Sequence, residues 1–384
     1  MNISKNIKLL KWFNFFSDFS LFSPIAILYF TQVTGSFALG MSIFSVSMIS
    51  AALFEVPTGI FSDRIGRKKT MTLGAISFTL SVLFYAIGGF YAILIIGAIL
   101  SGLGRSFYSG NNQALLYDTL LEDNQESKFH NYLGSVSSMF QLALAISALL
   151  GSFIAAWSFS LVVWLTLIPN IICIVISLKI YEPKRHSKKL EGNIYTHLSD
   201  AVREFLKNKR LRLLSISDVL KFGIGEASFT FSSAFIALVW PIWAIGLSKA
   251  LTFAAGALSF KYSGKIIDKY NPGRLLIISS LYNRISNLIA LIFPTVFSPI
   301  LLNSNALLYG VSSVSTSMLM QKEYTHEKRA TMDSLNSLAG SLFFGIFAII
   351  LGFSADKIGV IPSLIIVQFL SMSVFFIYYK LFRK

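Results

Sequence analysis

The chain has 384 residues, of which 54% are hydrophobic and only 13% are charged, whereas an ordinary soluble domain has about 25% charged residues. This composition excludes a soluble globular domain and indicates a membrane protein. The net charge of +15 lies almost entirely in one set of loops, so it reports orientation in a membrane and argues against a nucleic-acid partner.

Twelve stretches are long and apolar enough to cross a bilayer, which takes about 20 residues of helix. They lie near residues 10–31, 38–59, 71–90, 92–118, 130–155, 158–181, 212–236, 242–262, 274–295, 297–320, 331–354 and 358–380. No small-x-small cleavage site follows the first stretch, so we expect an uncleaved helix and not a signal peptide. The expected fold class is all-α integral membrane, with twelve transmembrane helices.

The basic residues are distributed unevenly between the two sides of the predicted spans. When the twelve spans are threaded through a membrane, 28 of the 33 lysines and arginines fall on one side. Cytoplasmic loops carry such an excess. We therefore expect a multi-pass protein of a bacterial-type inner membrane, with both termini in the cytoplasm. The single cysteine, Cys173, excludes an internal disulfide.

A hydrophilic segment divides the spans into six and six. We expect an N-terminal six-helix bundle at 1–181, a cytoplasmic linker at 182–211 and a C-terminal six-helix bundle at 212–384. Apolar residues recur at helical spacing from about residue 197 to 211, which predicts an amphipathic helix on the membrane face.

The two halves look like copies offset by about 200 residues. Asp18 in span one corresponds to Asp218 in span seven. The sequence "LLGSF" at 149–153 also recurs as "ILGFS" at 350–354. Repeated six-helix halves are typical of secondary transporters, in which two bundles move about a central site.

A charged loop, "GIFSDRIGRKKTM", joins spans two and three, and a second copy, "SGKIIDKYNPGRL", follows span eight. The characteristic residues are Gly59, Asp63, Arg64, Gly66 and Arg67 in the first copy and Gly264, Asp268 and Arg274 in the second. This pattern resembles the loop motif of the major facilitator superfamily, as do the segments "EVPTG" and "KRATMDSL". The resemblance covers nearly the whole chain and is closest to the drug-proton antiporter branches. It implies the major facilitator fold, alternating access and a monomer.

The first loop has more features than a positive charge alone requires. Gly59 and Gly66 permit a close helix approach and a tight turn. Asp63 can face the positive N-terminus of a neighbouring helix, which the resemblance identifies as the eleventh. Arg67 can pair with Asp118 at the cytoplasmic end of span four. We therefore expect a cytoplasmic gate, and the alternative is a solvated loop that only sets topology.

Six charged residues lie deep in the predicted spans, where a charge is costly and therefore marks a functional candidate. They are Asp18, Arg105, Asp218, Lys221, Glu226 and Arg284. The resemblance implies that spans one, four, seven and ten line the central cavity, and five of the six charges lie on three of these. The expected carriers of a proton or another coupling ion are Asp18 and Glu226, followed by Asp218 and Arg105. Arg105 alternatively forms a structural ion pair with Asp18, and Lys221 can form a local pair with Asp218. Arg284 has no assigned role.

Span four carries Ser101, Arg105, Tyr108, Ser109 and Asn112 at steps of three and four residues, which predicts one polar helix face. Further polar residues occur on spans one, seven and ten. The expected substrate-cavity residues are Asn14, Ser101, Tyr108, Asn112, Lys221, Tyr309, Ser312 and Thr316.

The sequence offers no enzyme chemistry. The four histidines lie in or beside loops without metal-ligand spacing, and no nucleotide-binding motif occurs. We expect no cofactor and no metal. The predicted function is proton-coupled export of a small drug-like or amphipathic molecule, with the lipid bilayer, the substrate and protons or another ion as partners. The alternatives are ion-coupled uptake or exchange of a small solute, with an anion among the candidates, and a non-transporting receptor.

Overall fold

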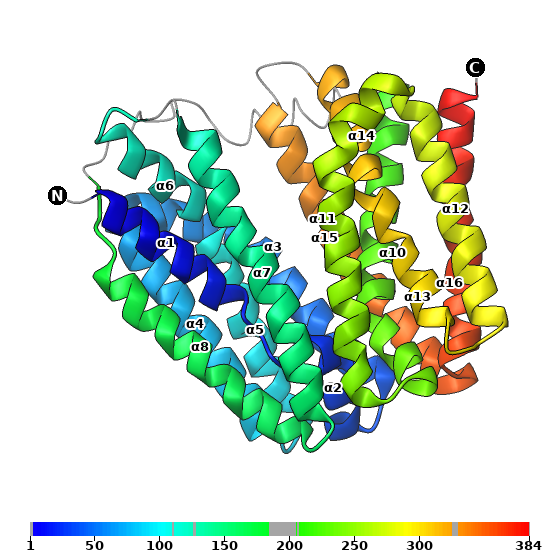
Figure 1. The fold of residues 1–384 in the computed structure, drawn as a ribbon, viewed down its shortest axis with the longest axis horizontal. Coiled ribbons are helices and arrows are strands. Elements are labelled where there is room, and N and C mark those ends of the chain that lie inside the picture. The colour runs from blue at the N-terminus through cyan, green and yellow to red at the C-terminus, as the bar shows by residue number, and fades with distance from the viewer. Residues whose placement is uncertain are drawn as a thin grey trace. The chain divides into compact units, whose positions relative to one another are not determined.

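The computed structural model describes residues 3–109, 111–125, 128–183, 205, 207–324 and 329–383, and within these ranges every regular element is a helix (Figure 1). The chain forms two compact units. The first contains Met1–Lys188 and Pro241–Ala250, and the second contains Lys189–Trp240 and Leu251–Lys384. Most of the linker at 182–211, with most of its predicted amphipathic helix, lies outside the described residues, so the division into three domains stays a prediction.

The first unit is built from the helices before the linker. They are α1 (Ile3–Asp18), η1 (Ser23–Ile25, a 3₁₀ turn), α2 (Ala26–Thr34), α3 (Phe37–Ile65), α4 (Arg67–Ile87), α5 (Tyr91–Tyr108), α6 (Asn111–Leu121), α7 (Phe129–Ala155) and α8 (Phe159–Lys179). Closely packed pairs include α4 with α5, α3 with α5, and α4 with α8.

The second unit is built from the helices after the linker, except that α11 begins in the first unit. They are α10 (Lys209–Val239), α11 (Ile242–Lys269), α12 (Pro272–Ile292), α13 (Ser298–Ser304), α14 (Ala306–Glu323), α15 (Arg329–Ile358) and α16 (Val360–Phe382). Here α10 packs against α15 and α16, and α12 packs against α16.

Short polar side chains start several of these helices. Ser36 accepts a hydrogen bond from the backbone N–H of Leu39 at 3.2 Å, and Ser158 does the same for Leu161. Asn208 caps α10 in the same way. Because the first N–H groups of a helix have no partner within it, such caps define where each helix begins.

Three of the predicted spans are not single continuous helices, which corrects the expectation of one helix for each span. Span one consists of α1, η1 and α2, with residues 19–22 between α1 and η1 outside any helix and Pro24 within η1. Span four consists of α5 and α6, because Ser109 leaves the helical conformation at φ −55° and ψ 124°. The tenth span is likewise formed by two helices, α13 and α14.

Eleven helical segments of the described chain are long and apolar enough to cross a membrane. They correspond to the predicted spans except the tenth. Many large apolar side chains are exposed, among them Phe153 at 56% and Ile168 at 54%. In a membrane such side chains contact lipid, so their exposure does not indicate a binding surface for another protein.

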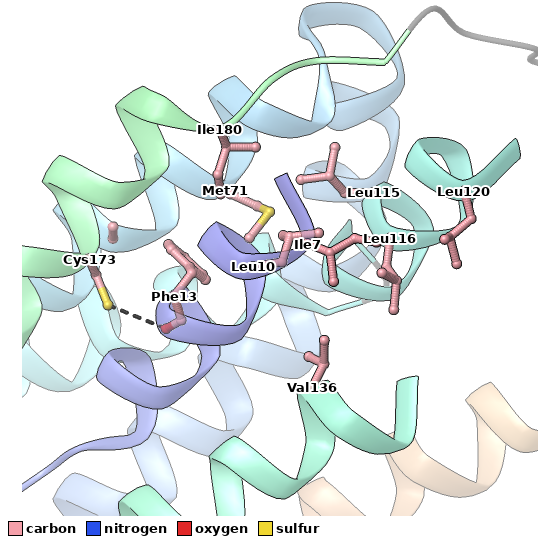
Figure 2. Packing of buried hydrophobic residues seen from close by; sticks show 11 residues of the cluster. Ile7, Leu10, Phe13, Met71, Leu115, Leu116, Leu120, Val136, Cys173 and Ile180 are labelled. Atoms are coloured by element: carbon pink, nitrogen blue, oxygen red, sulfur yellow. Dashed lines mark hydrogen bonds between the residues drawn. The ribbon is translucent and has the colours of Figure 1, made fainter. Parts of the chain in front are cut away.

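Each unit has its own apolar core. In the first unit, Leu10 and Phe13 of α1 face Met71 of α4 and Cys173 of α8 (Figure 2). The thiol of Cys173 donates a hydrogen bond to the carbonyl oxygen of Phe13 at 3.6 Å. In the second unit, the cluster includes Leu211, Leu214, Leu276, Met320 and Tyr378. These cores pack the shorter helices of the interrupted spans, among them α1, α6 and α14, against their neighbours.

Candidate functional site

The break in span one creates a polar point inside the first unit. Asp18 is the last residue of α1, and the chain then leaves the helix. Ser17 donates a hydrogen bond to the Asp18 carboxylate at 3.1 Å. Within the described residues, no lysine or arginine nitrogen lies within 4.0 Å of this carboxylate. Asp18 is therefore half-buried with one neutral donor.

The break is accommodated by a glycine of α7. A Cβ atom on Gly151 would overlap the carbonyl oxygen of Leu21, which lies in the break. Only glycine lets the backbone of α7 approach this closely. The position of the broken segment therefore depends on Gly151.

Arg105 lies on α5 and is exposed in mid-span. Its guanidinium contacts the sulfur of Met48 at 3.5 Å and interacts electrostatically with Asp18, but the two do not form an ion pair within 4.0 Å. The structural ion pair considered from the sequence is thus not formed. Because a guanidinium facing lipid is costly, the exposed side of Arg105 indicates an aqueous space.

Asn14 of α1 and Asn112 of α6 lie together. Asn14 donates to Asn112 at 3.0 Å, and the Asn112 amide donates back. The pair lines a cavity of about 150 Å³. Its other lining residues are Gln113, Leu116, Leu133, Val136, Ser137 and Phe140. Two of the predicted cavity residues are thus brought together in a neutral, amide-lined pocket.

The single polar face predicted for span four is wrong, because the helix is interrupted between α5 and α6. Ser101 accepts a hydrogen bond from Ser47 at 3.1 Å. Tyr108 packs against Phe13, with ring centroids 5.2 Å apart, and against Gly74. Tyr108 therefore belongs to the apolar core and does not line the amide pocket.

The loop after α3 contains the ion pair that the sequence analysis expected. The Nε atom of Arg67 lies 2.7 Å from Oδ2 of Asp118, and both side chains are partly buried. Gly66 has φ +109° and is the residue between α3 and α4, so it provides the expected tight turn. Gly59 does not mediate a close approach, because no described residue lies within 4 Å of a Cβ atom built there.

A residue that the sequence analysis missed completes this loop. The Glu182 carboxylate accepts the backbone N–H groups of Arg67 and Lys68 at 2.9 and 2.7 Å. It thereby caps the N-terminus of α4 from the end of α8. Tyr181 beside it donates to Glu122 at 3.1 Å, and this bond raises the pKa of the Tyr181 phenol. The sequence offered one signal for this cap: Glu182 is the acidic residue of "YEPKR", directly after an apolar run.

Asp63 and Arg64 lie on the last turn of α3. The second copy of the loop is built differently from the first. Asp268 and Arg274 are exposed, and neither forms an ion pair with the described residues. Asn271 caps α12, with its oxygen 2.9 Å from the nitrogen of Gly273. As at Gly59, nothing described lies within 4 Å of a Cβ atom on Gly264.

The carboxylate of the second unit that parallels Asp118 is Glu323, at the end of α14. It pairs with Arg210 at the start of α10, with Nε and Oε1 3.2 Å apart. Asn208 also donates to Glu323 at 3.1 Å. This ion pair therefore joins spans seven and ten. Asp268 and Arg274 of the second loop copy take no part in it.

Asp218 of α10 accepts a hydrogen bond from Asn336 of α15 at 2.6 Å. The predicted local pair with Lys221 is not formed within 4.0 Å, because the Lys221 ammonium donates to Ser312 of α14 at 2.7 Å instead. Asp218 and Thr316 line a second cavity, of about 270 Å³. Asn336 was not singled out in the sequence, since an amide on span eleven has no distinctive spacing.

The remaining predicted residues do not line this second cavity. Glu226 lies two turns beyond Asp218 on α10, and Tyr309 is 51% exposed and packs edge-on against Phe260. Arg284, which had no assigned role, donates to Gln368 at 3.2 Å and to Ser371. It therefore joins α12 to α16 as part of a buried polar network.

A family model described as Major Facilitator Superfamily matches residues 9–343, which is most of the chain. The chain belongs to the Major Facilitator Superfamily. A member of this superfamily is a multi-pass membrane transporter, so the chain is a transporter of a small molecule and not an enzyme.

Relatives and solved structures agree with this assignment. An uncharacterized MFS-type transporter of Methanocaldococcus jannaschii is 24% identical over 346 residues, which cover 88% of this chain and 87% of that protein. An uncharacterized transporter of Buchnera aphidicola is 28% identical over 178 residues, which cover 45% of this chain and 43% of that protein. The crystal structure of the nucleoside transporter NupG superposes with a TM-score of 0.83 at 15% identity, covering 100% of this chain and 100% of that one. The fold is therefore that of MFS transporters.

Proposed function

We propose that this MFS transporter couples proton movement to the export of a small amphipathic molecule, and that Asp18 carries the proton. The observation that carries the proposal is the setting of Asp18. Its carboxylate lies at the end of a half-helix, with Ser17 as its only hydrogen-bond donor among the described residues. An ionisable group at this depth is a functional candidate by default.

A carboxylate without a bonded cation can gain or lose a proton without first breaking an ion pair. Arg105 is near enough to act electrostatically on Asp18. It is also exposed, so it can respond to whatever occupies the aqueous space beside it. The protonation state of Asp18 and the aqueous space beside Arg105 are thereby linked within the first unit.

We propose further that Asp63, Arg67 and Asp118 form a gate on the cytoplasmic side. The ion pair between Arg67 and Asp118 supports this, as does the Glu182 cap that holds the same turn. A partly exposed ion pair contributes only about 1 kcal/mol, which suits a contact that must break in every transport cycle. The proposed orientation, with both termini in the cytoplasm of a bacterial-type inner membrane, rests on the basic residues.

Uptake of an anionic solute receives less support. The interior cation Lys221 donates to Ser312, and Arg284 is engaged by Gln368 and Ser371. The cavity of about 270 Å³ in the second unit is lined by the carboxylate of Asp218. Both cations thus have hydrogen-bond partners within the protein, although Nε of Arg284 has none among the described residues. Together with the carboxylate of Asp218, these contacts favour a substrate that is not an anion.

The proposal is tested in reconstituted vesicles with an imposed proton gradient and ethidium as the transported probe. We expect Asp18→Asn to abolish gradient-driven accumulation while downhill exchange of ethidium survives, because the substitution removes only the proton site. Glu226→Gln is the parallel variant on α10. Should both variants accumulate ethidium with the wild-type pH dependence, coupling through these two acids is rejected, and Asp218 becomes the next candidate.

A further inference from the structure

The second unit contains a cavity of about 270 Å³ between α10, α14 and α15. Ten side chains line it: Asp218, Val219, Phe222, Ser313, Thr316, Ser317, Met320, Asp333, Asn336 and Ser337. All ten residues belong to the second unit, so the cavity is formed within that unit.

The charge of the lining is entirely negative. Asp218 and Asp333 are its only ionisable residues. Each is held by a neutral amide: Asn336 donates to Asp218 at 2.6 Å, and Gln321 donates to Asp333 at 2.8 Å. In each case the amide occupies one carboxylate oxygen, so each carboxylate can accept further hydrogen bonds. The neighbouring Lys221 directs its ammonium to Ser312 and does not reach the lining.

Several hydroxyl groups at this site lack a partner. Ser313, Ser317 and Ser337 line the cavity, and their side chains form no hydrogen bond with the described residues. Tyr324, only 5% exposed, lies beside Asp333 and interacts with its carboxylate. Burial, with Asp333 next to it, raises the pKa of Tyr324. Ser317 and Ser337 are exposed and Ser313 is partly exposed, so their hydroxyls are available to a ligand in the cavity.

The size and the apolar wall decide what kind of cation fits. A bare metal ion needs about six oxygen ligands in a tight shell, whereas this cavity is far larger than one ion and is partly walled by Val219, Phe222 and Met320. Pockets for drug-sized ligands span about 300–1,000 Å³. The cavity therefore matches a small organic cation, with its charge near the carboxylates and its apolar part against Phe222.

We propose that the Asp218–Asp333 cavity binds a protonated amine, and that this amine is the substrate or its charged end. The inference rests on the proposed function, since it specifies the chemical class of the exported molecule. The two carboxylates accept the ammonium hydrogens, the free serine hydroxyls add further hydrogen bonds, and Phe222 faces the attached hydrocarbon.

The test uses the purified full-length chain in detergent and three probes that share one ring: benzylamine, which is positively charged at pH 7, neutral benzyl alcohol and anionic benzoate. We expect only benzylamine to raise the thermal unfolding midpoint in a dose-dependent way. Asp333→Asn and Asp218→Asn should each weaken benzylamine binding about tenfold or more, because a hydrogen bond to a charged group is lost. Asp123→Asn, an acid of the first unit outside this cavity, is the matched control and should bind as wild type.

Equal stabilisation by benzyl alcohol or benzoate would overturn the proposal, as would wild-type binding of benzylamine by both Asn variants. Stabilisation by magnesium chloride alone, without an effect of benzylamine, would replace the amine site with a metal site. Asp333 is exposed, so Asp333→Asn keeps the test valid if Asp218→Asn does not fold. Binding needs no proton gradient. A chain that exports ethidium through Asp18 but ignores benzylamine rejects only this inference, whereas one that binds benzylamine but shows no gradient-driven transport rejects only the proposed function.

Discussion

Two glycines of α7 are expected to respond in opposite directions to the same substitution. A Cβ atom on Gly151 overlaps the backbone carbonyl of Leu21, whereas one on Gly134 meets no described atom within 4 Å. The overlap at Gly151 involves backbone on both sides, so no side-chain rotation can relieve it. Adding a methyl group in such a place costs about 1–3 kcal/mol. Gly134→Ala instead improves helix propensity by up to about 1 kcal/mol.

Both replacements gain the same helix propensity, so the two variants should differ by the cost of the overlap, about 1–3 kcal/mol in unfolding free energy. Unfolding of the purified chain in mixtures of mild detergent and dodecyl sulfate, followed by circular dichroism, measures this difference. Gly134→Ala serves as the control because it makes the same chemical change in the same helix. If Gly151→Ala is as stable as Gly134→Ala, the close contact between α7 and the break in span one does not exist as described.

Three further outcomes are expected. In a double-mutant cycle, R67D and D118R should each destabilise the chain, and combining them should recover about 0.5–1 kcal/mol; strict additivity would mean that the ion pair contributes nothing. Gln368→Leu removes the acceptor shared by two buried donors and should cost about 1–3 kcal/mol of unfolding free energy, a loss that the detergent titration would show or refute. Because the pKa of Tyr181 is raised by its bond to Glu122, that bond persists at neutral pH and is lost only as pH rises beyond the ordinary tyrosine value. The tyrosinate absorbance that Tyr181→Phe removes should therefore titrate above the ordinary tyrosine pKa of about 10, and Glu122→Gln should return it to the ordinary range.

Apolar length and charge were sufficient to predict the fold class. A segment of about 20 apolar residues has few stable alternatives to a helix in lipid, and the family match supports the result. The contact between Arg67 and Asp118 was also predictable, because the loop motif ends where span three starts and Asp118 ends span four.

Contacts between helices were much harder to predict. Helical spacing places Lys221 within reach of Asp218, but it contains no information about Ser312 on another helix, which takes the ammonium instead. In the same way, spacing gives a polar face to Asn14 and to Asn112 separately and does not show that the two amides meet. Pro24 marks the break in span one locally, but the contact of this break with Gly151, far along the chain, is not visible in any local pattern.

That contact also has a consequence for synthesis in the cell. A ribosome adding about 5–20 residues per second makes Gly151 on the order of ten seconds after Leu21. During that interval residues 19–22 lack the close backbone contact with α7 that Gly151 permits. The packing of the first span around its break is therefore completed only after the fifth span has been made.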